Sequence, residues 1–218
     1  MELLNLLANS DNPLESARKI VAPFCKDRLN EYILNCKDCK TCSNNKVLAS
    51  GNPDANILII ADNATEKEEV NSFFNELLDY SNIDKKDIFI IHSVSCICKR
   101  KDKNEYIERI PSIEEAKNCK YFINYAIQFI RPRIIISMGA TALNQYIPNS
   151  NLIQNIDKMY EYNGIPTIIT YSSSDLFKLS EIKSEKESEE LVNTVINAFN
   201  KAQKYINNKR RVKNGINK

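Results

Sequence analysis

Four short apolar runs constrain the fold of this chain most strongly. They are rich in β-branched residues, and they span residues 57–61, 88–94, 134–137 and 167–171. The segments between them show the helical spacing of apolar side chains, at residues 66–80, 112–130 and 140–146. Apolar runs that alternate with helices indicate a parallel sheet covered on both faces. The sequence therefore predicts a three-layer α/β/α domain over residues 36–180, with a central, mostly parallel sheet of four strands.

The two ends of the chain differ from this central region. An amphipathic segment predicts a helical extension over residues 1–35, and a second helix followed by a basic tail is expected over residues 181–218. Residues 201–218 contain seven basic side chains and no acidic one, although the net charge of the whole chain is only +2. Such a tail is suited to nucleic-acid phosphates, and a solvated tail without a ligand is the alternative. The candidate phosphate contacts in it are Lys209, Arg210, Arg211 and Lys213.

Composition excludes several functional classes. The chain has one histidine and four glycines, and it contains no Walker loop, dinucleotide-binding glycine motif or zinc-protease motif. No stretch approaches the roughly 18–20 apolar residues of a membrane span, and no basic segment precedes an apolar run at the start. We therefore expect an intracellular protein that is neither secreted nor embedded in a membrane.

The cysteines are the clearest candidates for a metal site. There are seven, an odd number that does not favour a disulfide framework in an unexported chain. Three form a C-x2-C-x2-C motif, two follow the second predicted strand and one lies on the next helix; these are Cys36, Cys39, Cys42, Cys96, Cys98 and Cys119. With so little histidine, an all-thiolate site would hold either zinc or an iron-sulfur cluster. Free thiols are the alternative.

Motifs in a fixed order carry a family resemblance. The first C-x2-C is followed by G-N-P-D-A and the strand I-L-I-I, then by P-x3-E-A-K-N-C at a helix start, and then by R-P-R-I-I-I-S-M-G-A-T-A at residues 131–142. Over residues 36–177 this order resembles the iron-sulfur uracil-DNA glycosylases, family 4 and its close relatives. The resemblance implies a uracil-DNA-glycosylase-like fold and DNA as the partner. It also implies a [4Fe-4S] cluster, with zinc as the alternative, on Cys36, Cys39, Cys96 and Cys119; Cys98 or Cys42 could replace one of these ligands.

The catalytic motifs of that family are altered here. Its G-E-x-P-G loop reads Ala-Asp-Asn-Ala-Thr, so only an acidic residue, Asp62, remains. The asparagine that ends the second strand is replaced by His92, and the H-P-S motif reads Ser172-Ser173-Ser174. Phe73 and Phe74 lie near the position of the family's stacking aromatic, but their helical phase favours a core role. Removing one preorganised donor costs on the order of 100- to 1000-fold in rate, so the combined changes predict little standard uracil excision.

Three functions remain open at this point. The leading hypothesis is a DNA-binding iron-sulfur protein without standard uracil excision, acting as a subunit or accessory factor in DNA replication, repair or transcription. Its predicted DNA contacts are Lys99, Arg100, Lys101, Ser172, Ser173 and Ser174. The second is an active glycosylase of base excision repair that removes uracil or another damaged base, with Asp62 and His92 activating water. The third is a zinc-stabilised protein-interaction module.

Overall fold

A six-stranded sheet forms the centre of the protein. The computed structural model describes residues 12–39 and 42–213, without the side chains of residues 42–44 and 210–213. The strand order is β2-β4-β3-β7-β9-β8. The four inner strands are mutually parallel and correspond to the four predicted runs: β3 (Ile57–Asn63), β4 (Ile88–Val94), β7 (Ile134–Met138) and β9 (Ile165–Thr170). The prediction of a mostly parallel α/β sheet is confirmed.

The sheet has two more strands than the four that the sequence predicts. Strand β2 (Ser50–Gly51) pairs antiparallel with β4 at one edge, and β8 (Met159–Tyr162) pairs antiparallel with β9 at the other. Both are short, and neither carries a continuous apolar run, because an edge strand buries fewer of its side chains. A second, antiparallel sheet joins β1 (Cys42–Lys46), β5 (Cys96–Asp102) and β6 (Glu105–Glu108) in the order β1-β5-β6.

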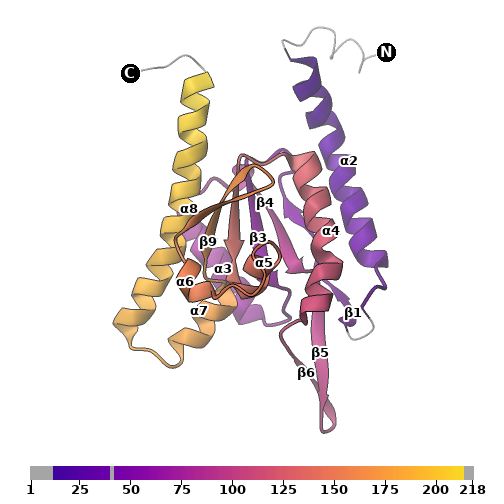
Figure 1. Ribbon diagram of the computed structural model, residues 1–218, viewed down its shortest axis with the longest axis vertical. Coiled ribbons are helices and arrows are strands. Elements are labelled where there is room, and N and C mark those ends of the chain that lie inside the picture. The colour runs from indigo at the N-terminus through magenta and orange to yellow at the C-terminus, as the bar shows by residue number, and fades with distance from the viewer. Residues whose placement is uncertain (1–11, 40–41, 214–218) are drawn as a thin grey trace.

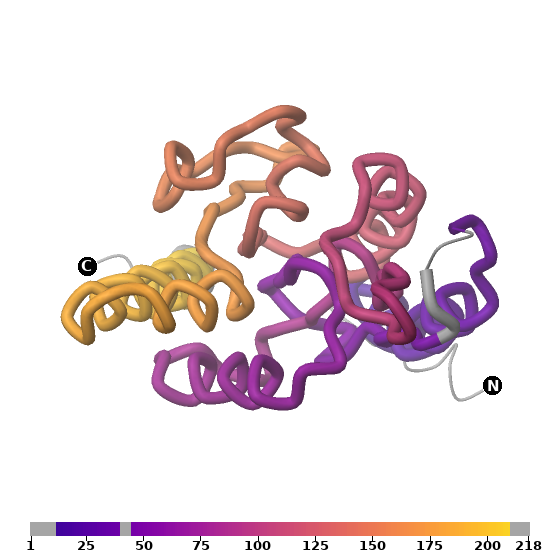
Figure 2. Tube along the Cα trace, turned by 90° about the horizontal axis from the view of Figure 1, so that it is seen from below, coloured from indigo at the N-terminus to yellow at the C-terminus, as the bar shows by residue number. Residues whose placement is uncertain are grey.

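Helices cover both faces of the main sheet (Figures 1 and 2). Alternate residues of β3 point to opposite faces, so Leu58 and Ile60 pack in one core cluster and Ile57 and Ile59 in the other. The first cluster is closed by α2 (Pro13–Asn35) and α4 (Ile113–Ile130). The second is closed by α3 (Glu68–Tyr80), α7 (Ser173–Ser180) and α8 (Glu185–Lys213). Three shorter elements complete the chain: η1 (Lys85–Asp87), α5 (Gly139–Asn144) and α6 (Leu152–Asn155).

Both terminal helices contribute to these cores. Helix α2 buries Leu29 and Ile33 completely, and α8 buries Val195 and Phe199 completely. The basic run predicted near the end of the chain begins at Lys209, and the structure describes no side chain beyond that residue. In the described part of the chain, no helix combines the length and the apolar character that a membrane span needs.

Helix α4 begins at a capping box. The Ser112 hydroxyl accepts a hydrogen bond from the Glu115 amide, and the Glu115 carboxylate accepts one from the Ser112 amide at 2.7 Å. The Glu115 carboxylate also forms a two-pronged contact with Arg109, at 2.6 and 2.7 Å. This cap fixes the end of α4 beside the segment that carries β5 and β6.

Replacing Ser112 by alanine is expected to lower the free energy of unfolding by about 1 kcal/mol, because the Glu115 amide loses its side-chain acceptor. Urea denaturation followed by circular dichroism would measure the change. The control is Ser180, an exposed residue at the carboxyl end of helix α7. Its replacement by alanine should change stability less. Equal effects of the two replacements would contradict the role of the cap.

Candidate functional site

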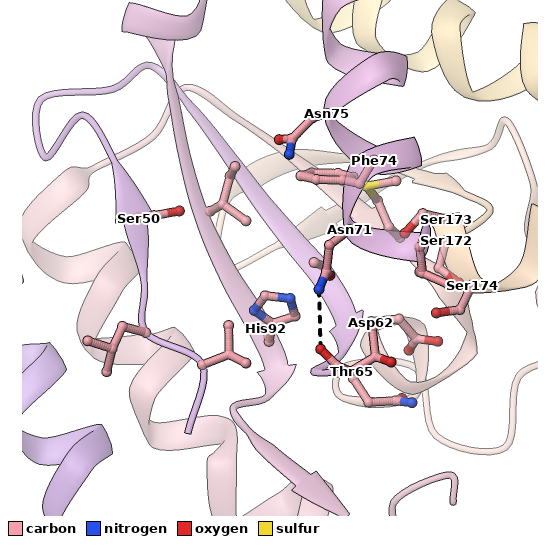
Figure 3. Close-up of a pocket in the computed structure, with 17 residues that line it drawn as sticks. Ser50, Asp62, Thr65, Asn71, Phe74, Asn75, His92, Ser172, Ser173 and Ser174 are labelled. Carbon is pink, nitrogen blue, oxygen red and sulfur yellow. Dashed lines mark hydrogen bonds between the residues drawn. The ribbon is translucent and has the colours of Figure 1, made fainter. Parts of the chain in front are cut away.

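A pocket of about 210 Å³ lies at the carboxyl ends of β3 and β4 (Figure 3). Strand β3 contributes Asp62, β4 contributes His92, and helix α3 contributes Phe74. The start of α7 contributes the three serines 172–174. The carboxyl ends of parallel strands are where ligands bind in open α/β sheets. The pocket thus brings together both predicted catalytic residues and the predicted serine loop.

Asp62 is held against the start of helix α5. Its carboxylate accepts a hydrogen bond from the Thr141 amide at 3.1 Å, and the Ala142 amide also donates to it. Burial, together with the nearby charge of Asp175, raises the pKa of Asp62 to about 7, although these hydrogen bonds oppose the shift. The carboxyl therefore holds its proton to a much higher pH than an exposed aspartate does.

Gly139 makes this placement of Asp62 possible. Its φ is +88°, a conformation that side-chain-bearing residues rarely adopt. A Cβ atom at this position would lie 2.6 Å from the carboxyl carbon of Asp62. The start of α5 and the Asp62 carboxyl therefore fit together only because residue 139 is glycine.

His92 is a neutral imidazole in the pocket. Burial lowers its pKa to about 4, so the ring carries no charge at neutral pH. Its Nδ1 atom is buried and has no hydrogen-bond partner among the described residues. The parallel register places His92 opposite Ala61, not Asp62, so the two predicted catalytic side chains leave their strands on opposite faces of the sheet. The structure brings them to one pocket without joining them by a hydrogen bond in the described part of the chain.

The three serines differ in what they can do. The Ser172 hydroxyl donates to the Asp175 carboxylate at 2.8 Å and accepts from the Asp175 amide at 3.0 Å, and Ser172 is only 2 % exposed. Ser172 is therefore the cap of helix α7, and its hydroxyl is already engaged. Ser173 and Ser174 line the pocket from the first turn of α7.

A wide groove adjoins the pocket. Its volume is about 1040 Å³, and Asp62 and Ser174 line both the groove and the pocket. The groove runs past the β5–β6 hairpin, the loop after β3, the start of α5 and α7. Its lining carries charges of both signs. The basic side chains are Lys67, Arg100, Arg109 and Lys178, and the acidic ones are Asp62, Glu66, Glu68, Glu69, Glu108 and Asp175.

The predicted DNA contacts on the hairpin occupy different positions. Lys99 forms an ion pair with Glu66 at 2.6 Å, so its ammonium group already has a partner within the protein. Arg100 lines the groove. Lys101 is exposed on the outer part of the hairpin. Of the three, Arg100 and Lys101 are thus available to an external anion.

Four thiols gather where α2, β5 and α4 meet. Burial, together with the neighbouring thiols of Cys96, Cys39 and Cys36, raises the pKa of the Cys119 thiol to about 12. These three residues therefore lie within electrostatic range of Cys119. The Lys46 ammonium group donates to the Cys96 sulfur at 3.1 Å.

The other two cysteines of the predicted set have different positions. Cys98 is buried in the same core cluster, with its sulfur 3.7 Å from the carbonyl oxygen of Cys96. The side chain of Cys42 is not among those that the structure describes. Among the described residues, no three cysteine, histidine or acidic side chains meet in a ready-made chelating geometry.

Comparison with known proteins identifies the family. The sequence profile of the Uracil DNA glycosylase superfamily matches residues 48–196, more than half of the chain. The chain belongs to the uracil-DNA glycosylase superfamily. The resemblance inferred from the motifs is confirmed, and the matched region contains Asp62, His92, the three serines 172–174 and all residues that line the groove.

Two characterised members of the superfamily are similar to the chain. The type-4 uracil-DNA glycosylase of Thermotoga maritima is 29 % identical over 130 residues, which cover 55 % of this chain and 64 % of the relative. The type-4 uracil-DNA glycosylase of Saccharolobus solfataricus is 26 % identical over 149 residues, which cover 61 % of this chain and 64 % of the relative. The matched part of the chain thus spans just under two thirds of each relative.

Some residues that line the pocket were not predicted from the sequence. Asn71 and Asn75 line it from α3, one turn apart, and Phe74 lies between them. Phe74 also packs against the core, as predicted, so it contributes to both. The sequence did contain a signal for this polar part of the pocket, because two asparagines lie four residues apart on an otherwise apolar face of the helix.

Proposed function

We propose that this member of the superfamily binds DNA through its groove and hairpin and does not carry out standard uracil excision. The observation that supports the proposal is the charge of the pocket. The described residues that line it include no lysine or arginine, and its imidazole, that of His92, is neutral. When the glycosidic bond breaks, uracil departs with the bonding electron pair as an anion, and a nearby positive charge stabilises that anion. This pocket offers none.

The acidic residue is also poorly suited to standard excision. A general base must take a proton from the attacking water as the water oxygen bonds to the sugar carbon. The Asp62 carboxylate already accepts hydrogen bonds from the Thr141 and Ala142 amides. These bonds occupy part of its acceptor capacity and so reduce its capacity to take a proton from water.

The exposed basic side chains of the hairpin, Arg100 and Lys101, are the feature that favours DNA as the partner. The phosphate backbone supplies most of the non-specific affinity of proteins for nucleic acid. The groove beside the hairpin is lined by both basic and acidic side chains, so it is the hairpin that supplies the positive charge. A protein that binds DNA without excising a base is suited to act as an accessory factor in a replication, repair or transcription complex. We place the chain in that class.

The thiol cluster fits an iron-sulfur site. The buried Cys119 thiol and the three thiols within electrostatic range of it supply the all-cysteine donor set that [4Fe-4S] clusters and structural zinc prefer. We propose that Cys36, Cys39, Cys96 and Cys119 hold a [4Fe-4S] cluster. Bound there, the group would brace the segment that carries the hairpin against α2 and α4. Zinc on the same thiols is the alternative that metal analysis would identify.

A second function has one observation in its favour. A carboxyl whose pKa is raised to about 7 by burial, as that of Asp62 is, matches the working range of a general base or acid. An active glycosylase with altered base specificity would use this group. The same experiment decides between the two functions.

The deciding experiment is incubation of the protein with DNA that contains a single uracil, in single-stranded and double-stranded form, followed by alkali. We expect no alkali-labile sites above background, while the same DNA still shifts in an electrophoretic binding assay. A type-4 relative serves as the positive control. Strand breaks that are lost on replacing Asp62 by asparagine would overturn the proposal in favour of an active glycosylase.

A further inference from the structure

The β5–β6 hairpin extends from the body of the protein at the pocket end (Figure 1). Its strands pair antiparallel, with Lys99 opposite Glu108 and Lys101 opposite Tyr106. A two-residue turn at 103–104 joins them, and Lys103 adopts a φ of +51° there. The hairpin is thus a regular two-stranded arm.

The base of the arm is fixed to the loop that borders both the pocket and the groove. The Glu108 carboxylate accepts hydrogen bonds from the Thr65 hydroxyl and from the Glu66 amide, both at 2.7 Å. On the neighbouring strand, Lys99 forms its ion pair with the Glu66 carboxylate. Lys99 and Glu108, which lie opposite each other across the arm, therefore both bind this loop. Their contacts set the position of the arm relative to the pocket.

The same face of the arm continues outward beyond the loop. Side chains alternate between the two faces of a strand, so Lys101 and Tyr106 share the face of Lys99 and Glu108. They stand about 7 Å further from the body, because each residue of a strand adds roughly 3.4 Å. Tyr106 is 70 % exposed, and neither side chain makes a hydrogen bond or ion pair with the part of the chain that the structure describes.

We propose that Lys101 and Tyr106 form a contact for an unpaired DNA strand that approaches the groove. The Tyr106 ring stacks on one base, and the Lys101 ammonium group pairs with a phosphate of the same strand. Proteins that bind single strands combine aromatic platforms with cations in this way. Bases inside a duplex already stack on their neighbours, so the exposed ring favours unpaired DNA. The inference rests on the proposed DNA-binding function and deepens it by assigning the form of DNA.

Replacing Tyr106 by alanine tests the stacking contact. We expect the full chain to bind a fluorescein-labelled single-stranded oligonucleotide, and the alanine variant to bind it roughly 5- to 150-fold more weakly, the range for one stacked base. Replacement by phenylalanine keeps the ring and should preserve affinity. Tyr80, which is 78 % exposed at the end of α3 farthest from the pocket, is the matched control, and its replacement by alanine should have no effect.

Replacing Lys101 by glutamine tests the phosphate contact. The dependence of log affinity on log salt concentration should become shallower by about 0.7, the value for one phosphate of a single strand. Lys85, which pairs with Asp79 at the far end of the sheet, gives a control with the same change in net charge, and its replacement by glutamine should leave the slope unchanged.

The outcomes separate this inference from the proposed function. If the protein binds single-stranded DNA and the Tyr106→Ala variant binds it equally well, the arm contact is wrong and the DNA-binding function stands. Tighter binding of duplex than of single-stranded DNA would also overturn the arm contact alone. If the unaltered protein binds neither form at low salt, both the function and the contact fail. Equal thermal unfolding of all variants would show that the differences arise at the contact.

Discussion

Replacing Asp62 by asparagine is expected to raise the free energy of unfolding at pH 8 by up to about 4 kcal/mol relative to the unaltered protein, with a much smaller effect at pH 4. Burial raises the pKa of Asp62 to about 7 from an ordinary value of 3.8. Between these values the folded state binds more protons than the unfolded state, so stability falls as the pH rises from about 4 to about 7. Each pKa unit is worth about 1.4 kcal/mol, and the asparagine variant, which does not titrate, avoids this loss.

Asparagine suits this test because its side-chain oxygen can still accept the hydrogen bond from the Thr141 amide. Urea unfolding at several pH values between 4 and 8 would give the two stability curves. Asp79, an exposed carboxylate paired with Lys85, supplies the control, and its replacement by asparagine should leave a curve parallel to that of the unaltered protein. Parallel curves for the Asp62 variant as well would mean that Asp62 is ionised in the folded state at low cost.

The central strands could be predicted because their signal is local. Each inner strand is a run of side chains buried on both faces, such as Ile57 and Leu58 in β3, and that burial appears directly as continuous apolar sequence. The edge strands β2 and β8 gave no such signal. Their pairing with β4 and β9 depends on neighbours that the chain reaches only after folding, so the sequence predicted four strands where the sheet has six.

The site was predicted at the level of position but not of orientation. Strand ends at Asp62 and His92 could be identified, and the structure places both at one pocket. Which face each side chain occupies depends on the register of β3 against β4. That register places His92 beside Ala61, and no local pattern contains this information.

The hairpin was missed for a different reason. Its strands carry charges where an apolar run would be expected, because little of the arm beyond its base is buried. The pairing of Lys99 with Glu108 across the arm is the kind of opposite-charge pair that stabilises exposed strands. A basic run followed by acidic residues, separated by a short polar turn, was therefore an available signal for the arm.

Replacing Cys119 by serine is expected to abolish the proposed iron-sulfur cluster. The Cys119 thiol is buried and lies within electrostatic range of Cys36, Cys39 and Cys96, and three remaining thiols cannot complete a four-ligand site. The variant, purified without oxygen, should lack the absorbance near 400 nm that iron-sulfur clusters show, and it should contain little iron. The unaltered protein should be brown under the same conditions.

Two further cysteines make the ligand assignment specific. Cys25 lies on α2, outside the four-thiol set, so its replacement by serine should leave colour and iron content unchanged. Cys98 points its sulfur toward the Cys96 carbonyl, so its replacement should also preserve the cluster. If the Cys98 variant loses the cluster and the Cys119 variant keeps it, Cys98 is the ligand in place of Cys119. If the purified protein is colourless and contains one equivalent of zinc, the site holds zinc and not an iron-sulfur cluster.

Stability measurements separate loss of the ligand from loss of packing. A metal that binds only the folded state stabilises it, so the Cys119→Ser variant should unfold more readily than the loaded protein. Serine is close to cysteine in shape, so the variant and the unaltered protein stripped of metal should unfold at similar urea concentrations. If the stripped protein is as stable as the loaded one, the group does not brace the arm. In that case the ion pair of Lys99 with Glu66 and the hydrogen bonds of Glu108 would hold the arm without it.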